Sequence, residues 1–113
     1  MSFILKEMKL IPHGHFKGVS DMKIVLQDEK KCWYTDCTYN LHKHHIFNGP
    51  LRKKSERYGL TVWIRADLHN GGGPDAVHSN EEKNMELKKI GQRAFEEVYG
   101  HDKFMQEFHK NYL

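Results

Sequence analysis

The sequence predicts a mixed α+β domain, with short strands in its first two thirds and helices in its last third. Two observations lead to this prediction. Short runs rich in β-branched and aromatic residues, of which 60–64 is the clearest, are separated by glycine, proline and asparagine. From residue 81 onward, apolar residues instead recur at helical spacing. A length of 113 residues predicts one domain, 1–113, with a modest core.

Two strands and a turn are expected in the N-terminal β extension, residues 1–31. Residues 3–10 alternate loosely between apolar and polar side chains, and residues 22–27 contain an apolar run at 24–26. The segment Pro12–His15 between them is typical of a turn. Its two histidines, His13 and His15, are expected to be solvated rather than metal-bound, because they are isolated from the other histidines.

The middle of the chain, residues 32–80, is expected to form a hairpin-based metal module. Residues 45–47 predict a short strand, which Asn48-Gly49-Pro50 ends, and residues 60–64 predict a second strand. The segment 51–58 between them is polar and basic, and its pattern predicts neither a helix nor a strand.

The helical tail, residues 81–113, is expected to contain two helices. Ser79 and Asn80 can cap the first helix, and the acidic pair at 81–82 suits the positive end of its dipole. Gly100 is expected to end this helix, and Asp102 to begin a shorter one. The apolar stripe of the first helix is expected to be core without a cofactor role; it consists of Leu87, Ile90, Ala94, Phe95 and Val98.

Composition places the chain among polar, soluble proteins. Apolar residues make up 38% of it, and no apolar run approaches the length of a membrane span or a signal-peptide core. We therefore expect a cytoplasmic protein without a membrane partner. The net charge of +3 permits nucleic-acid binding without demonstrating it.

The distribution of nine histidines is the most informative feature of the sequence. His44 and His45 are adjacent, while His69 and His78 bracket a turn whose Gly71–Gly73 can bring two imidazoles to one ion. Three neutral imidazoles with an open fourth position suit zinc, and small domains often use a metal for stability. Neighbouring side chains in a strand face opposite sides, so His44 and His45 can do different jobs.

Further histidines and two cysteines complete the inventory of metal ligands. His42 could substitute for a neighbouring ligand but is expected to be exposed, as are His101 and His109 in the tail. Cys32 and Cys37, separated by four residues, are either ligands of a second metal site or two unlinked thiols near a strand turn.

The order and spacing of these residues resemble the HNH endonucleases, also called ββα-metal or His-Me finger nucleases. The resemblance is narrower to small HNH-like proteins of phages and prophages from Gram-positive bacteria. It covers residues 32–113 and rests on the cysteine pair, the His44–Phe47 segment, the two later histidines and the Asn111-Tyr112-Leu113 ending. It implies a ββα-metal core, to which residues 1–31 add a β-hairpin and residues 81–113 a helical tail.

The resemblance also implies roles for individual residues. His44, His69 and His78 would bind one divalent metal ion, and His45 would be the general base. Zinc is the expected ion, with magnesium or manganese as alternatives for a nuclease. A basic run would contact DNA phosphates, although such a run by itself is more typical of a solvated surface; it consists of Arg52, Lys53, Lys54 and Arg57.

The chain departs from the family pattern at its zinc knuckle. Relatives carry a second cysteine pair that completes a four-cysteine site, whereas this chain has Arg65 and Leu68 at those positions. Cys32 and Cys37 are therefore either idle or recruit an outside ligand such as Asp67.

A second departure concerns the asparagine that orients the base in the family, which is missing near residues 58–60; Asn48 and Asn70 are candidate replacements.

The resemblance and the departures from it lead to two hypotheses about function. The first is a metal-dependent DNA endonuclease of phage origin. The alternative is a non-catalytic zinc metalloprotein that binds and inhibits a host defence nuclease, in the manner of an anti-CRISPR inhibitor of a Cas9-like effector. A DNA-binding module that does not cut is a third, weaker hypothesis.

Overall fold

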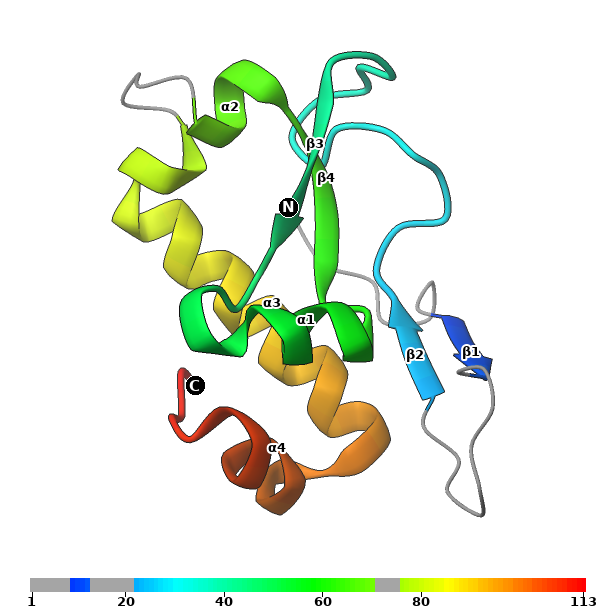
Figure 1. The fold of residues 1–113 in the computed structure, drawn as a ribbon, viewed down its shortest axis with the longest axis vertical. Coiled ribbons are helices and arrows are strands. Elements are labelled where there is room, and N and C mark those ends of the chain that lie inside the picture. The colour runs from blue at the N-terminus through cyan, green and yellow to red at the C-terminus, as the bar shows by residue number, and fades with distance from the viewer. Residues whose placement is uncertain (1–8, 13–21, 71–75) are drawn as a thin grey trace.

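A computed structural model describes residues 9–12, 22–70 and 76–113, which form a mixed α+β structure (Figure 1). The predicted α+β class is confirmed. Within these residues there are two antiparallel sheets of two strands each, accompanied by four α-helices and two 3-10 turns. The elements are β1 (Lys9–Pro12), β2 (Met22–Val25), β3 (Leu41–His45), η2 (Gly49–Leu51), α1 (Arg52–Tyr58), β4 (Thr61–Arg65), α2 (Ala66–Asn70), η3 (Val77–Ser79), α3 (Glu81–Tyr99) and α4 (His101–Phe108).

The β3–β4 hairpin positions the candidate site. Its register places His44 opposite Val62 and His42 opposite Ile64, so these four side chains share one face. Val62 and Ile64 are fully buried in the core that also receives the apolar stripe of α3. The alternation along β4 confirms the strand predicted at 60–64, shifted by one residue.

The strand expected at 45–47 lies earlier in the chain, at 41–45. Ile46 and Phe47 leave the strand and are buried in the core, and the Ile46 N–H donates to the Leu60 carbonyl at 3.1 Å. The histidine pair therefore ends a strand instead of beginning one. Pairing with β4 decides these bounds, and local apolar character does not reveal that pairing.

The basic run lies on α1, a helix over residues 52–58 that follows η2 at residues 49–51; the sequence pattern predicted neither element. A buried hydroxyl anchors the helix: Ser55 Oγ accepts from the Phe47 N–H at 3.1 Å and donates to the Leu60 carbonyl at 2.6 Å. The helix ends at Gly59, whose φ is +79°. A Cβ there would collide with the carbonyl oxygen of Ile24, so glycine allows β2 to approach this close.

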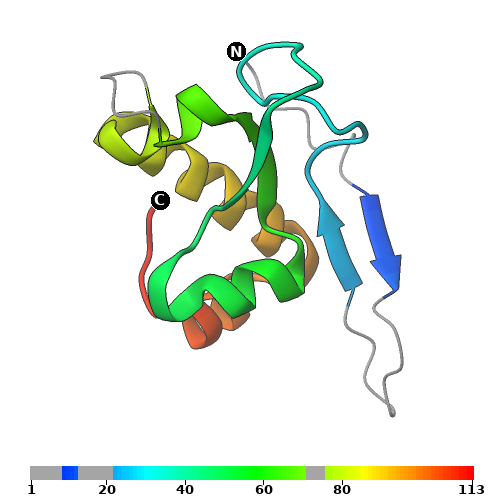
Figure 2. The same ribbon diagram turned by 45° about the horizontal axis from the view of Figure 1, so that its top comes forward.

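The β1–β2 hairpin forms a separate sheet beside the rest of the fold (Figure 2). It docks through Ile24, which is buried in the common core. The strand predicted at 22–27 is confirmed at 22–25, but Pro12, expected in a turn, is the last residue of β1 and pairs with Met22. Residues 3–8 of the first predicted strand, together with His13 and His15, lie outside the described residues.

The helical tail follows the prediction closely. Asn80 caps α3 by accepting the Lys83 N–H on its side-chain oxygen at 2.9 Å, and Gly100, at φ +88°, ends the helix. The next helix, α4, begins at His101, one residue before the expected start. Aromatic rings from both helices and from the segment after β3 pack together in the core; they are Phe47, Phe95, Phe104 and Phe108.

Candidate metal centre

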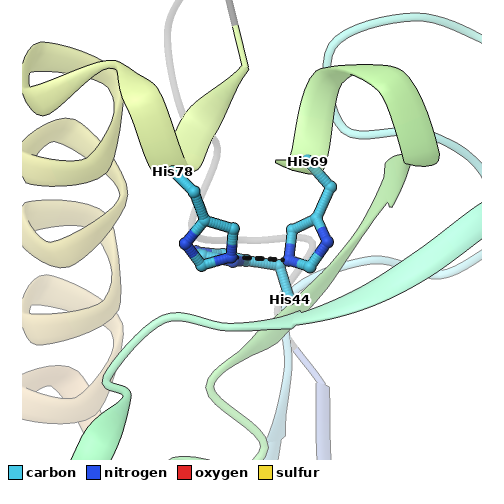
Figure 3. Close-up of side chains that lie close together, drawn as sticks. All are labelled: His44, His69 and His78. Atoms are coloured by element: carbon cyan, nitrogen blue, oxygen red, sulfur yellow. Dashed lines mark hydrogen bonds between the residues drawn. The ribbon is translucent and has the colours of Figure 1, made fainter. Parts of the chain in front are cut away.

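Three histidines from three elements converge beside the β3–β4 hairpin (Figure 3). His44 lies on β3, His69 on α2 and His78 on η3. One ring nitrogen of each lies within 4.8 Å of the others, and the Nε2 atoms of His69 and His78 are 3.0 Å apart. His69 is brought to the hairpin because α2 follows β4 directly, and His78 because η3 lies just before α3. The structure thus brings together the three ligands named from the sequence; Gly71–Gly73, between two of them, lie outside the described residues.

His44 is the buried member of this histidine triad, with only 1% of its surface exposed. Neither of its ring nitrogens has a hydrogen-bond partner among the described residues. Leaving a polar group buried and unpaired costs about 1–3 kcal/mol. Burial lowers the pKa of His44 to about 3, and the neighbouring His69 and His78 add to the effect. The ring is therefore neutral at pH 7, the form in which imidazole binds a metal.

His69 is held neutral for similar reasons. Burial lowers its pKa to about 4, with further contributions from His78 and His42. Two nitrogens bound to a tetrahedral zinc at about 2.0–2.1 Å lie roughly 3.3 Å apart. The 3.0 Å between His69 and His78 is close to that spacing. The three imidazole donors, the neutral rings of His44 and His69, and the spacing between the His69 and His78 nitrogens therefore fit a zinc-type ion.

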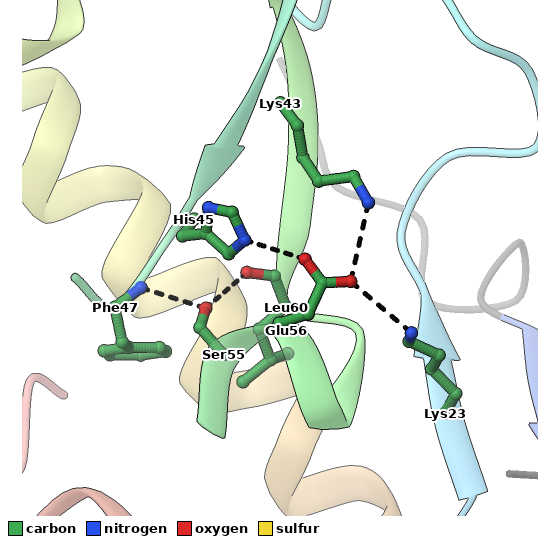
Figure 4. Close-up of polar contacts among 7 residues, drawn as sticks. All are labelled: Lys23, Lys43, His45, Phe47, Ser55, Glu56 and Leu60. Atoms are coloured by element: carbon green, nitrogen blue, oxygen red, sulfur yellow. Dashed lines mark hydrogen bonds and ion pairs between the residues drawn. The ribbon is translucent and has the colours of Figure 1, made fainter. Parts of the chain in front are cut away.

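His45 turns to the other face of the hairpin and meets α1 (Figure 4). Its Nε2 lies 2.7 Å from Oε1 of Glu56, while Oε2 of Glu56 pairs with Lys43 at 3.4 Å and Lys23 at 3.6 Å. The hydrogen bond from His45, followed by the two lysines, lowers the pKa of Glu56. Because an ionised carboxylate only accepts, Nε2 of His45 donates its N–H to Glu56, and in a neutral ring the lone pair is then on Nδ1.

Glu56 is a residue that the sequence analysis missed. Asn48 and Asn70 were the candidates to orient His45, and Glu56 contacts it instead. The available signal was helical spacing: in a helix over 52–58, Glu56 lies one turn after Arg52 and shares its face. Because the segment was not predicted to be helical, the sequence analysis did not place Glu56 and Arg52 on one face.

His45 borders two adjacent hollows on the surface. One, of about 330 Å³, is shared with the histidine triad, and the other, of about 650 Å³, extends along α1. Arg52 and Lys43 line both hollows, and Lys53 and Arg57 line the second. Three residues of the predicted basic run therefore stand beside His45, together with Lys43, which was not predicted.

Lys54, the remaining residue of that run, lines neither hollow. Its ammonium donates to the backbone carbonyl of Glu107 on α4 at 2.9 Å, and its side chain is partly buried. This contact ties α1 to α4 and takes Lys54 away from both hollows.

The two cysteines lie on a turn that packs against β4. Cys32 Sγ accepts the Arg65 N–H at 3.2 Å, and Cys37 Sγ donates to the Tyr39 carbonyl at 3.3 Å. Burial acts to raise the pKa of Cys32, but hydrogen bonds, first that from Arg65, lower it overall. Asp67, the suggested outside ligand, has both carboxylate oxygens on the Arg65 guanidinium. Within the described residues, no three-ligand group includes either cysteine, and a second metal site stays a prediction.

The remaining described histidines are exposed, as expected. His101 pairs with Glu96 at 2.6 Å, and His109 ends α4 at a φ of +68°. His42 is exposed as well, yet its Nδ1 lies 3.2 Å from Nδ1 of His69.

The chain matches no protein-family model, no curated protein and no solved structure. None of the helices in the described part of the chain has the length and apolar character needed to cross a bilayer.

Proposed function

We propose that this protein is a metal-dependent endonuclease that cleaves phosphodiester bonds in DNA. One observation carries the proposal: His44, with both nitrogens buried and unpaired, faces His69 and His78, while its neighbour His45 faces a carboxylate on the opposite side. A proposed metal ligand and a proposed general base are thus adjacent in sequence and point to opposite faces of β3. This arrangement suits the roles that the HNH resemblance implies.

The triad His44, His69 and His78 would hold one divalent ion, with zinc favoured by a set of three imidazole nitrogens. When bound, the ion would supply a Lewis acid that stabilises negative charge on the phosphate and on the leaving oxygen. Burial of His44 supports this role, because an apolar surrounding strengthens the attraction between an ion and an anionic substrate.

His45 would act as the general base. Glu56 holds its Nε2–H, so Nδ1 can take a proton from a water molecule. The water oxygen then forms a bond to phosphorus, the bond from phosphorus to the leaving oxygen breaks, and that oxygen takes up a proton from solvent. Glu56 remains ionised throughout and stabilises the positive charge that His45 gains.

The basic lining of the two hollows supports a polyanionic substrate. Arg52 and Lys43 border the triad and His45 at once, and Lys53 and Arg57 extend the positive surface along α1. Phosphate contacts of this kind dominate the affinity of proteins for DNA. A duplex lying along α1 would bring a phosphodiester to the hollow that both His44 and His45 line.

The order of elements gives the proposal further support. Under the HNH resemblance, β3, β4 and α3 correspond to the ββα-metal core, with α1 between the two strands and with α2 and η3 between β4 and α3. The proposed ligands lie on β3, α2 and η3. On this proposal, β1–β2 and α4 are additions at the two ends of that core.

Incubation of the purified protein with plasmid DNA and Mg²⁺, Mn²⁺ or Zn²⁺ tests the proposal. We expect nicking or linearisation that chelators abolish and that His45→Ala lowers by at least about a hundredfold. His109→Asn is a matched control, since it alters an exposed histidine at a backbone conformation that asparagine tolerates. Equal cleavage by His45→Ala and the wild type would contradict the proposal.

The same experiment separates the nuclease from the non-catalytic alternative. Stoichiometric metal binding that depends on His44, with no cleavage under any of the three metals, would exclude a nuclease. It would instead favour a zinc metalloprotein that binds a partner such as a Cas9-like effector. Capture of such an effector by the wild type, with loss of capture in His44→Ala, would then test that alternative.

A further inference from the structure

His42 stands next to the histidine triad without belonging to it. It lies two residues before His44 on β3 and therefore faces the same side of the hairpin. Its ring meets that of His69 edge to face, at an interplanar angle of 88°, with Nδ1 of each ring 3.2 Å from the other. Each ring nitrogen of His69 therefore lies within hydrogen-bond distance of another imidazole: Nε2 of His78 and Nδ1 of His42.

We propose that His42 is a positioning residue that orients His69 for metal binding by accepting a hydrogen bond from its Nδ1–H. The inference rests on the metal site proposed above and adds a residue to it. A neutral imidazole has one N–H and one lone pair. If Nε2 of His69 gives its lone pair to the metal beside His78, the proton sits on Nδ1. Nδ1 of His42 then accepts a hydrogen bond from that N–H, and the proton of His42 itself sits on its Nε2.

The position of His69 explains why it needs such a partner. It lies on α2, a helix of five residues, and its side chain is only half-buried. Packing alone therefore restrains its ring weakly, in contrast to the fully buried His44. A hydrogen bond at Nδ1 fixes both the rotation of the ring and its tautomer. Metal-binding histidines generally donate their second N–H to such an acceptor, and removing the acceptor typically weakens metal binding 10- to 100-fold.

The geometry favours this role over that of a fourth ligand. The nitrogen of His42 nearest to His69 faces Nδ1, whereas the triad forms around Nε2 of His69. In line with this, the nitrogens that lie within 4.8 Å of one another belong to His44, His69 and His78, without His42.

Two substitutions of His42 separate the hydrogen bond from the bulk of the side chain. His42→Asn keeps an acceptor close to the position of Nδ1, whereas His42→Leu removes it and keeps a similar size. Zn²⁺ affinity is measured by competition with a chromophoric chelator, with His109→Asn as the control. We expect His42→Leu to bind Zn²⁺ about tenfold more weakly and His42→Asn to stay within about threefold of the wild type.

Two spectroscopic readouts test the mechanism without any cleavage assay. The Co²⁺-loaded His42→Leu protein should show the same visible ligand-field band as the wild type, because its ligands are unchanged. Nitrogen-15 correlation spectra of the Zn²⁺-loaded wild type should show His69 protonated at Nδ1. A shifted Co²⁺ band, His69 protonated at Nε2, or equal Zn²⁺ affinities of His42→Leu and the wild type would each overturn the role of His42.

These outcomes are distinct from failure of the proposed function. If the wild type and His42→Leu bind Zn²⁺ equally while His44→Ala loses it, the metal site stands and the role of His42 falls. If the affinities follow the expected order but no DNA is cleaved, His42 keeps its role and the nuclease proposal falls. A wild type with no more affinity for Zn²⁺ than His44→Ala overturns both.

Discussion

His44 and His45 are neighbours in sequence and face opposite sides of the β3–β4 hairpin. His44 is buried against His69 and His78, while His45 reaches Glu56 at 2.7 Å. One strand thus carries a candidate metal ligand on one face and a candidate base on the other, and substitutions on the two faces should have separable effects.

Glu56→Gln should lower DNA cleavage while leaving metal affinity unchanged. The amide removes the charge that stabilises protonated His45, and general-base contributions are of the order of 10²–10⁴ in rate. We expect a loss of kcat of at least about tenfold, measured with saturating DNA, and wild-type Zn²⁺ affinity in the chelator competition. A loss confined to KM would assign Glu56 to DNA binding instead.

Metal binding should stabilise the fold through His44. The ion would give one of the two unpaired nitrogens of that buried ring a partner, so it would bind the native state in preference to the unfolded chain. Zn²⁺ at a hundred times its dissociation constant should raise the free energy of unfolding by about 2.7 kcal/mol. Urea unfolding with and without Zn²⁺ measures this gain. The gain should disappear in His44→Ala and persist in His109→Asn, and a gain of equal size in His44→Ala would place the ion elsewhere.

The metal-free protein should lose stability in acid over a defined range. The folded pKa of His44 is about 3 and that of His69 about 4, both below the ordinary value of 6.5. Below pH 6.5 the unfolded chain therefore binds more protons than the native state, so the free energy of unfolding falls as pH falls. For His44 the slope reaches at most about 1.4 kcal/mol per pH unit, and half-exposed His69 contributes less.

Urea unfolding of chelator-treated protein between pH 7.5 and 4.5 measures this slope. His44→Leu, which has no group to protonate, should give a flatter profile in the same range. Parallel profiles for the wild type and His44→Leu would show that the loss comes from other groups.

Arg52 and Lys54 should differ in their effect on DNA binding although they lie on the same helix. Arg52 lines both hollows beside His45, whereas Lys54 is tied to the Glu107 carbonyl. Arg52→Ala should reduce the slope of log affinity against log salt by about 0.9, the value for one phosphate contact. Lys54→Ala should leave that slope unchanged. Fluorescence anisotropy across a salt series measures both, and a reduced slope in Lys54→Ala would place this lysine on the DNA.

Ser55→Ala should destabilise the fold without touching the site directly. It leaves the Phe47 N–H, now bonded to Ser55 Oγ at 3.1 Å, buried without a partner. The cost of such an unpaired group is about 1–3 kcal/mol. Thr38→Ala, at an exposed hydroxyl, is the control and should change stability by less than about 0.5 kcal/mol. Equal denaturation midpoints for the two variants would show that the Ser55 bonds do not anchor α1.

The sequence by itself determined those features that depend on local patterns. The run of β-branched and aromatic residues at 60–64 predicted β4, and the helical repeat, the Asn80 cap and Gly100 predicted α3 with both its ends. The histidine pair and the two later histidines, together with the HNH resemblance they carry, named the three side chains that meet at the triad. Opposite orientations for His44 and His45 followed from strand geometry alone.

Tertiary structure decided the rest. The segment 51–58 is mostly polar. Its helix depends on hydrogen bonds between Ser55 and the backbone groups of Phe47 and Leu60, and no local pattern shows these bonds. Glu56 reaches His45, and Lys23 reaches Glu56, only because α1 and β2 dock against the hairpin. His42 meets His69 for the same kind of reason, since α2 folds back over β3. Local periodicity encodes which face a side chain occupies, but the partner on that face is set by contacts between segments far apart in the chain.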